Sequence, residues 1–191
     1  MNELPIVVMV SGRAGEAKST FSNLCVEYLE KFSRKSKIVS FAYGVKSTAN
    51  AMGWNSEKDD KGRRLLQQIG NIGREYNEDV WANMAVRNIL ESQVDVVFID
   101  DWRFPNEGNV IITKFINVIK VRICRPEEHH TLNGTDLYDD ISETSLPEVE
   151  TGFYNHIVDN IGSLDELRAM ASEFIESKIV SRLTTTNGGK E

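Results

Sequence analysis

The sequence predicts an α/β protein in which helices cover both faces of a parallel β-sheet. Short apolar runs that suit buried strands alternate with longer segments that carry apolar residues at helical spacing. The links between most of these segments are short, as expected when helices cross over between parallel strands. A chain of 191 residues, 40% of them hydrophobic, is long enough to bury one full core. We therefore expect a single domain over residues 1–183.

The individual elements follow from apolar periodicity and from turn residues. The strands expected from short apolar runs are residues 5–10, 38–42, 94–99, 117–123 and 156–160. The helices expected from helical spacing span about residues 18–33, 43–52, 61–69, 78–92, 106–114 and 163–181. Gly70 and Gly73 are expected to end the third helix. Ser163 and Glu166 form a capping box at the start of the last helix.

Two long segments interrupt the alternation of strands and helices. Residues from about 46 to 92 are helical and lie between the second and third strands, which predicts an insertion that covers a substrate. Residues 125–152 are polar and poor in apolar anchors, which predicts a lid of low local stability. We expect residues 184–191 to form a disordered tail.

The first strand leads into a loop that suits phosphate binding. Residues 12–20 read GRAGEAKST. Every fixed position of the pattern Gly-x-x-x-x-Gly-Lys-[Ser/Thr] matches except the second glycine, where Ala17 stands. Backbone N–H groups of such a loop and of the following helix converge on an anionic phosphate. A Cβ at position 17 is tolerated if φ is negative and strained if φ is positive.

This loop gives the candidate nucleotide-binding residues and implies ATP and Mg²⁺ as ligands. We expect Lys18, exposed in the loop, to reach the β- and γ-phosphates, and the Ser19 hydroxyl to contact Mg²⁺. The complete set of loop candidates is Gly12, Arg13, Ala14, Gly15, Glu16, Ala17, Lys18, Ser19 and Thr20.

Acidic residues follow the third strand. Asp100 and Asp101 are expected beside the phosphate loop, because the carboxyl ends of parallel strands meet at one edge of a sheet. An acidic residue at this edge is the second element that a Mg²⁺–phosphate site needs. Arg103, two residues further on, can bind phosphate oxygens in bidentate fashion.

The stretch DWRFPNE at residues 101–107 resembles the Asp-x-Arg-Phe-x-Asn-Glu motif of bacteriophage-type deoxynucleoside monophosphate kinases, a family of P-loop kinases. Three other stretches are similar to that family: Phe41-Ala42 with Lys46, Arg64-x-Leu66-Gln67-x-x-Gly70 with Gly73-Arg74 and Trp81, and Ser142-Glu143-Thr144. Together they span residue 6 to about residue 165. The chain departs from the family at Ala17, and at Asp140-Ile141, where a histidine precedes Ser-Glu in the family.

The resemblance implies transfer of the γ-phosphoryl group of ATP to a deoxynucleoside 5′-monophosphate, in the host cytoplasm if a phage encodes the chain. The catalytic candidates are Lys18, Asp101, Arg103 and Arg125. The metal-binding candidates are Ser19 and Asp101. The substrate-binding candidates are Lys46, Arg64, Gln67, Arg74 and Trp81. We expect Arg74 to bind the acceptor phosphate and Gln67 to bind a base edge through two hydrogen bonds.

Several assignments stay open at this point. Either Arg63 or Arg64, but not both, is expected to face the cleft. Arg122 or Arg125 bridges the transferring group, or both are solvated charges at a strand end. Competing functions are another P-loop small-molecule kinase, such as dephospho-coenzyme A kinase, and a non-catalytic nucleotide-binding protein. The spacing of His129, His130 and Cys124 fits no common zinc site. The preferred base and sugar are not specified.

Charge and composition exclude several classes of function. A net charge of −7 argues against binding to nucleic acid polymers or to anionic membranes. No apolar run is long enough to span a membrane, and none has the form of a signal peptide. Cys25 and Cys124 lie in apolar patterns, which favours reduced thiols and a cytoplasmic protein. A homodimer is among the assemblies that the sequence leaves open.

Overall fold

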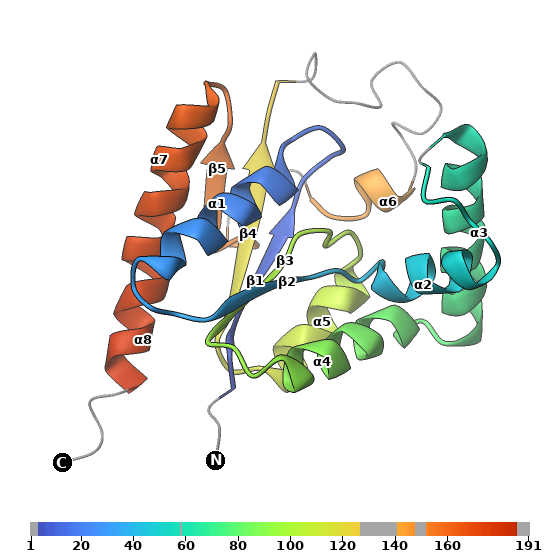
Figure 1. Cartoon of the computed structure of the whole chain (residues 1–191), viewed down its shortest axis with the longest axis horizontal. Coiled ribbons are helices and arrows are strands. Elements are labelled where there is room, and N and C mark those ends of the chain that lie inside the picture. Colours follow the sequence, from blue (N-terminus) through green and yellow to red (C-terminus); the bar gives the residue numbers. More distant parts are fainter. Residues whose placement is uncertain (1–3, 58, 127–140, 148–151, 187–191) are drawn as a thin grey trace.

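Five parallel strands form one sheet in the spatial order β2-β3-β1-β4-β5 (Figure 1). The computed structural model describes residues 4–57, 59–126, 141–147 and 152–186. The strands are β1 (Ile6–Ser11), β2 (Ser36–Val39), β3 (Val96–Ile99), β4 (Val118–Cys124) and β5 (His156–Asp159). The predicted fold class, a parallel sheet with helices on both faces, is confirmed.

The helices cover the sheet in two layers. Their bounds are α1 (Lys18–Glu30), α2 (Tyr43–Ala51), α3 (Asp60–Tyr76), α4 (Val80–Ser92), α5 (Pro105–Lys114), α6 (Ile141–Thr144), α7 (Leu164–Phe174), the π-helical segment η2 (Ile175–Val180) and α8 (Ser181–Thr186). Val8 and Val10 pack in one apolar cluster with α1 and α7, whereas Val7 and Met9 pack in another with α4 and α5. This alternation explains why all of β1 is buried.

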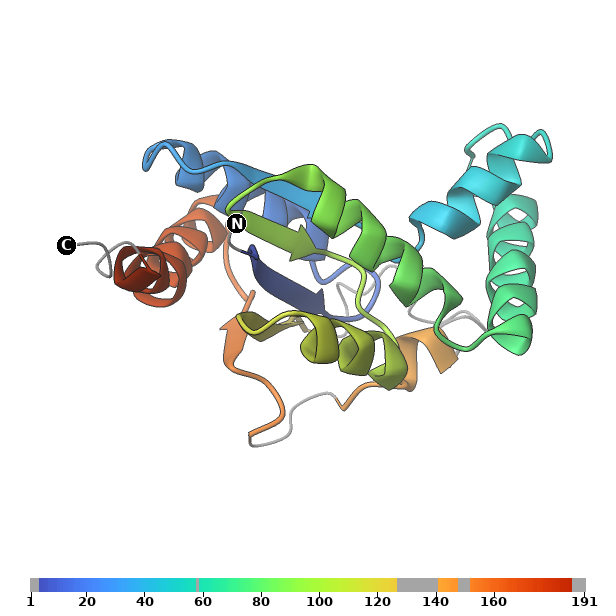
Figure 2. The ribbon, with the colours of Figure 1, turned by 90° about the horizontal axis from the view of Figure 1, so that it is seen from below.

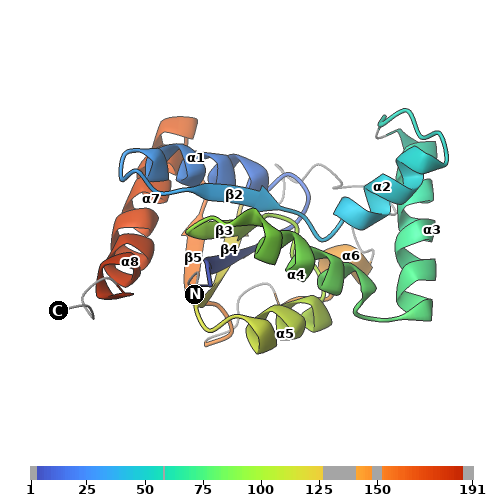
Figure 3. The same cartoon turned by 60° about the horizontal axis from the view of Figure 1, so that its bottom comes forward.

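The segment between β2 and β3 projects from one end of the molecule. In Figures 2 and 3, α2 and α3 stand apart from the layers that cover the sheet. They have a small core of their own with the start of α4, formed by Val45, Ala49, Ile69 and Trp81. The carboxyl ends of β1 and β3 face this segment across a cavity. Residues that follow these strands line one side of the cavity, and residues of the segment line the other.

Helix α3 is longer than the sequence predicts. It runs from Asp60 to Tyr76 without a break at Gly70 or Gly73. The indole Nε1 of Trp81 donates a hydrogen bond to the Gly70 carbonyl oxygen at 3.1 Å, and a Cβ on Gly73 would clash with the Trp81 ring. Gly73 therefore allows α3 and α4 to approach closely, and the expectation that Gly70 and Gly73 end the helix is wrong.

Two other predictions about the chain change in detail. β2 ends at Val39 rather than at residue 42, and only Val39 is buried in this edge strand. The capping box of Ser163 and Glu166 at the start of α7 is confirmed. The helical region then continues to residue 186, so the first residues of the expected tail are helical.

Part of the expected lid is described. It comprises residues 125–126, 141–147 and 152, and it includes the short helix α6. Residues 127–140, with the histidine pair, and residues 148–151 lie outside the described residues. Among the helices that are described, none combines the length and the apolar character needed to cross a bilayer.

Candidate active site

The loop between β1 and α1 has the backbone conformation of a tight turn. Gly12 and Gly15 have φ angles of 154° and 94°. Ala17 is left-handed, with φ 69° and ψ 29°. Of the two conformations considered for this position, the structure therefore has the strained one, which costs an L-residue roughly 1 kcal/mol or more. No side chain caps the start of α1, so its first N–H groups point toward the loop without a side-chain acceptor.

Lys18 is buried, not exposed as the sequence suggested. Only 9% of the residue is accessible. Its Nζ donates hydrogen bonds to the carbonyl oxygens of Gly12 at 2.7 Å and Arg13 at 2.8 Å. Burial lowers the pKa of Lys18 to about 8, and the positive charge of Arg103 acts in the same direction. The ammonium group is thus already inside the loop, held by two neutral acceptors that an anionic phosphate can replace.

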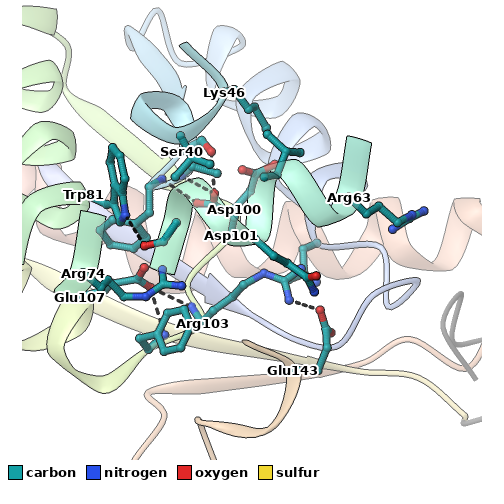
Figure 4. A pocket seen from close by; sticks show the side chains of 18 of the residues that line it. Ser40, Lys46, Arg63, Arg74, Trp81, Asp100, Asp101, Arg103, Glu107 and Glu143 are labelled. Carbon is teal, nitrogen blue, oxygen red and sulfur yellow. Dashed lines mark hydrogen bonds and ion pairs between the residues drawn. The ribbon is translucent and has the colours of Figure 1, made fainter. Parts of the chain in front are cut away.

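The carboxylate of Asp101 is bound to the turn that follows β2. It accepts hydrogen bonds from the Ser40 hydroxyl at 2.6 Å, the Phe41 N–H at 2.9 Å and the Ala42 N–H at 3.0 Å. Figure 4 shows Asp101 with Ser40 above it. Asp101 therefore joins the end of β3 to the start of α2.

Asp100 is the carboxylate next to the phosphate loop. It is hydrogen-bonded to Ser19, the hydroxyl expected at the metal. Burial raises the pKa of Asp100, and the Ser19 hydrogen bond opposes this. Asp100 and Asp101, adjacent in the turn after β3, thus contact different loops. Ser19 is therefore bonded to Asp100 in this structure, and the expectation that Asp101 binds the metal stays a prediction.

The turn from β3 to α5 is held by internal hydrogen bonds. The Glu107 carboxylate accepts from the N–H groups of Arg103 at 3.1 Å and Phe104 at 3.0 Å. The Trp102 indole, almost fully buried, donates to the Phe104 carbonyl oxygen at 2.9 Å. Burial raises the pKa of Glu107 to about 7, although these N–H groups oppose the shift. The turn fixes the backbone of Arg103, whose side chain points into the cavity (Figure 4).

Glu143 of α6 reaches the same place from the described part of the lid. Its carboxylate forms an ion pair with the Arg103 guanidinium (Figure 4). The other carboxylate oxygen accepts a hydrogen bond from the Ala14 N–H of the phosphate loop at 2.8 Å. The Glu143 side chain is only 5% exposed.

These groups surround one cavity of about 430 Å³. One side is formed by Lys18, Ser19 and Asp100, and the other side by the helical insertion. Lining residues from the insertion include Lys46, Arg63, Leu66, Gln67, Gly70, Arg74 and Trp81. The predicted residues Lys46, Gln67, Arg74 and Trp81 are thus brought together with the phosphate loop.

Arg64 does not line this cavity. Arg63, Gln67 and Arg74 share one face of α3 because their spacing is close to whole helical turns. Arg64 lines a separate surface groove together with Gln68. The sequence-based choice of Arg64 is wrong, and Arg63 is the arginine of this pair that faces the cavity.

Arg74 and Trp81 form the end of the cavity on the insertion side. The Arg74 guanidinium lies 4.5 Å from the centre of the Phe104 ring, and its Nη2 donates to Asn71 Oδ1 at 2.7 Å. Trp81 packs on the glycine face of α3 and is only 8% exposed. Its role is therefore mainly to fix α3 against α4.

Glu16 lies beneath the phosphate loop rather than at its mouth. Its buried carboxylate accepts a hydrogen bond from the Arg13 N–H and lies 3.4 Å from Arg122 Nη2. Arg125 contacts the same region, with its Nη1 donating to the Gly15 carbonyl oxygen at 3.4 Å. Neither Arg122 nor Arg125 lines the cavity, so in this structure both brace the loop.

Sequence reasoning missed Asp100 as the partner of Ser19, and it gave no role to Glu107 and Glu143, although both lie in the stretches that resemble the kinase family. The capping spacing from Phe104 to Glu107 was a usable signal for Glu107, because a glutamate at the third position of a helix binds the turn before it. Within the described segments, no group of three or more His, Cys, Asp or Glu residues is placed to hold a metal ion.

Comparison with curated proteins gives one distant relative and no family. No protein-family model matches the chain. An uncharacterized protein, ORF77 of Ictalurid herpesvirus 1 (strain Auburn), is 28% identical over 141 residues, which is 72% of this chain. The matched part is 58% of the viral protein, so the chain spans less than two thirds of that relative's length.

Comparison with solved structures identifies the fold. A gluconokinase from Sinorhizobium meliloti 1021 aligns with a TM-score of 0.51 at 14% identity, covering 96% of this chain and 98% of that one. A sugar kinase from Janibacter sp. HTCC2649 aligns with a TM-score of 0.50 at 12% identity, covering 90% and 95%. The chain therefore shares its fold with these two solved kinases.

Proposed function

We propose that the chain is a phosphotransferase that uses ATP to phosphorylate a deoxynucleoside 5′-monophosphate. One observation carries the proposal. A phosphate loop with a buried lysine and a hydroxyl–carboxylate pair opens into the same cavity as the arginines and the glutamine of the helical insertion. A cavity of about 430 Å³ is of the size that holds small-molecule ligands.

The donor nucleotide would occupy the phosphate-loop side. The N–H groups at the start of α1 and Lys18 would bind the phosphate oxygens, and Lys18 would exchange its two carbonyl acceptors for them. Ser19 and Asp100 supply the hydroxyl and carboxylate oxygens that suit Mg²⁺, which neutralises phosphate charge when bound.

The acceptor would occupy the side formed by the insertion and the β3–α5 turn. Arg74 and Arg63 would bind the acceptor phosphate, and Arg103, between the two sides, would face the transferring group. Gln67, one turn along α3 from Arg63, would hydrogen-bond to the base edge. Phosphoryl transfer requires mainly alignment and charge stabilisation, which these residues provide.

A direct test is a coupled assay for ADP formation with a panel of acceptors. The panel contains deoxy- and ribonucleoside monophosphates, gluconate and dephospho-coenzyme A, because sugar and coenzyme kinases are the competing assignments. Turnover with at least one deoxynucleoside monophosphate, and much less with the other acceptor classes, is expected. Preferred phosphorylation of gluconate or dephospho-coenzyme A would contradict the proposal that the acceptor is a nucleoside monophosphate. No turnover with any acceptor would contradict the proposal that the chain is a phosphotransferase.

Substitutions on α3 test how the acceptor is bound. Arg74→Ala should lower kcat/KM for all monophosphates alike, because a phosphate contact carries no base information. Gln67→Ala should lower kcat/KM by different factors for different monophosphates. The loss should correspond to roughly 1–3 kcal/mol of binding free energy for the base whose polar edge loses its partner. Arg64→Ala is the matched control, since Arg64 lies on the same helix but faces away from the cavity. Uniform loss with Gln67→Ala would contradict the assignment.

A further inference from the structure

Glu143 binds to groups that suit a phosphate. One oxygen of its carboxylate accepts the Ala14 N–H at 2.8 Å, and the other forms the ion pair with Arg103. The N–H belongs to the phosphate loop, and the guanidinium projects into the cavity between the donor and acceptor sides. Backbone N–H groups of such loops and arginine forks are the donors that bind phosphate oxygens in proteins.

The position of Glu143 is also electrostatically distinct. Burial and the charge of Arg103 lower the pKa of Lys18, and the negative charge of Glu143 is the largest influence in the opposite direction. Glu143 therefore lies close to both cations at the centre of the site. Its side chain is 5% exposed, so the carboxylate is shielded from solvent.

We propose that Glu143 is an internal competitor of the terminal phosphate of the nucleotide. Its carboxylate occupies the donors of Ala14 and Arg103 in the unliganded protein and leaves them when a polyphosphate binds. The proposal rests on the proposed function only in naming the ligand as a nucleotide polyphosphate. It assigns α6 a regulatory contact, because nucleotide affinity then depends on how often Glu143 is displaced.

The physical consequence is a reduced apparent affinity for anions. A ligand that needs the vacated donors binds only the fraction of molecules in which Glu143 has left, and its apparent dissociation constant rises by the inverse of that fraction. A carboxylate and a phosphate cannot share the Ala14 N–H, and the repulsion between the two anions adds to this exclusion.

The test is calorimetric titration of inorganic tripolyphosphate, and separately of a non-hydrolysable ATP analogue, into the full chain and into Glu143→Gln. Glutamine keeps the length of the side chain and removes its charge. We expect both ligands to bind about tenfold more tightly to the variant, as when Glu143 occupies the site in about nine molecules of ten. Equal or weaker binding would overturn the proposal and make Glu143 part of the nucleotide site.

Two comparisons separate competition from a general effect of charge. Glu30→Gln changes the net charge equally at the exposed last residue of α1 and should leave both affinities unchanged. In an Arg103→Gln background, Glu143→Gln should give a clearly smaller gain, because the ion pair is already absent. An equal gain in the control Glu30→Gln, or an undiminished gain without Arg103, would overturn the proposal.

A second variant covers the case in which Glu143→Gln does not fold, which circular dichroism would reveal. Glu143→Asp keeps the charge but shortens the side chain, and should bind tripolyphosphate between one and ten times as tightly as the wild type. Weaker binding by Glu143→Asp would contradict competition. Tripolyphosphate affinity does not depend on any acceptor, so tighter binding without kinase turnover would keep this proposal and reject the proposed function.

Discussion

The two loops that meet at the carboxyl ends of β1 and β3 differ in how their polar groups are satisfied. The phosphate loop contains a left-handed alanine, Ala17, and a buried charged lysine, Lys18, whose Nζ donates hydrogen bonds to two carbonyl oxygens. The β3–α5 turn instead has carboxylates that each bind two or three donors, Asp101 toward β2 and Glu107 toward the turn itself.

This difference indicates that the phosphate loop serves ligand binding and that the β3–α5 turn serves structural support. Strained residues and incompletely compensated charges persist where a ligand completes the site, so the phosphate loop is expected to be costly for the fold and useful for function. A turn whose donors and acceptors are paired is expected to stabilise the fold and to hold catalytic groups in place. Substitutions should therefore change ligand binding in the first loop and stability in the second.

The largest effect is expected for Lys18→Met. Loss of the ammonium group should lower kcat for phosphoryl transfer by of the order of 10³ or more. The free energy of unfolding should stay the same or rise by about 1 kcal/mol, because the removed charge was buried and only two hydrogen bonds are lost. Steady-state kinetics and urea denaturation of the purified variant measure both quantities. A large loss of stability would place Lys18 among the supporting residues and contradict the comparison.

Substitutions of the adjacent residues Asp100 and Asp101 are expected to have opposite effects: one should lower activity and the other stability. Asp101→Ala leaves the Ser40 hydroxyl and the N–H groups of Phe41 and Ala42 without their carboxylate, and should lower the free energy of unfolding by about 3 kcal/mol. Asp100→Asn should change stability by less than about 1 kcal/mol but lower kcat at least a hundredfold, since it would lose a Mg²⁺ ligand. The reverse pattern would restore Asp101 as the metal-binding residue.

Glu107 gives the supporting turn a pH dependence. Its pKa is about 7 in the folded protein and 4.5 in its ordinary state, so between these values the folded protein binds more protons than the unfolded chain. Stability should therefore fall as the pH rises from 4.5 to 7, by roughly 2–3 kcal/mol from this residue. Glu107→Gln keeps an acceptor for Arg103 and Phe104 and should lack this fall, which thermal unfolding across the pH range would reveal. An unchanged pH profile in the variant would mean that other groups cause it.

The fold and the position of the loop after β1 could be predicted from the sequence because their signals are local. The apolar run before Gly12 and the spacing to Lys18 and Ser19 specify a strand, a turn and a helix within fifteen or so residues. Alternation of such units specifies a parallel sheet, and the sheet places residues after β3 beside the loop.

The remaining features depend on contacts between distant segments. Gly70 and Gly73 look like helix breakers, yet the Trp81 ring occupies the space that a side chain on Gly73 would fill and donates a hydrogen bond to the Gly70 carbonyl oxygen. The choice between Asp100 and Asp101 depends on which neighbouring loop each side chain meets after the last residue of the strand. Glu143 is more than a hundred residues from Ala14 in the chain, and no periodicity links them. Such pairs are decided by tertiary packing, which a local pattern does not contain.

The smallest expected effect is that of Ala17→Gly, and it tests whether the phosphate loop is strained. With φ at 69°, the Cβ of Ala17 crowds the backbone in a way that glycine avoids, which favours the folded glycine variant by roughly 1 kcal/mol. The greater freedom of glycine in the unfolded chain offsets part of this, by about 0.4–1 kcal/mol. Stability should therefore change little, whereas ATP affinity should rise by up to about fivefold, because the loop reaches its binding conformation more easily. Calorimetry with an ATP analogue measures the affinity, and Ala14→Gly is the control within the same loop, since Ala14 is not among the residues with positive φ. Weaker ATP binding in Ala17→Gly would mean that the methyl group packs productively, in keeping with the contact of Ala17 with the apolar cluster beneath α1.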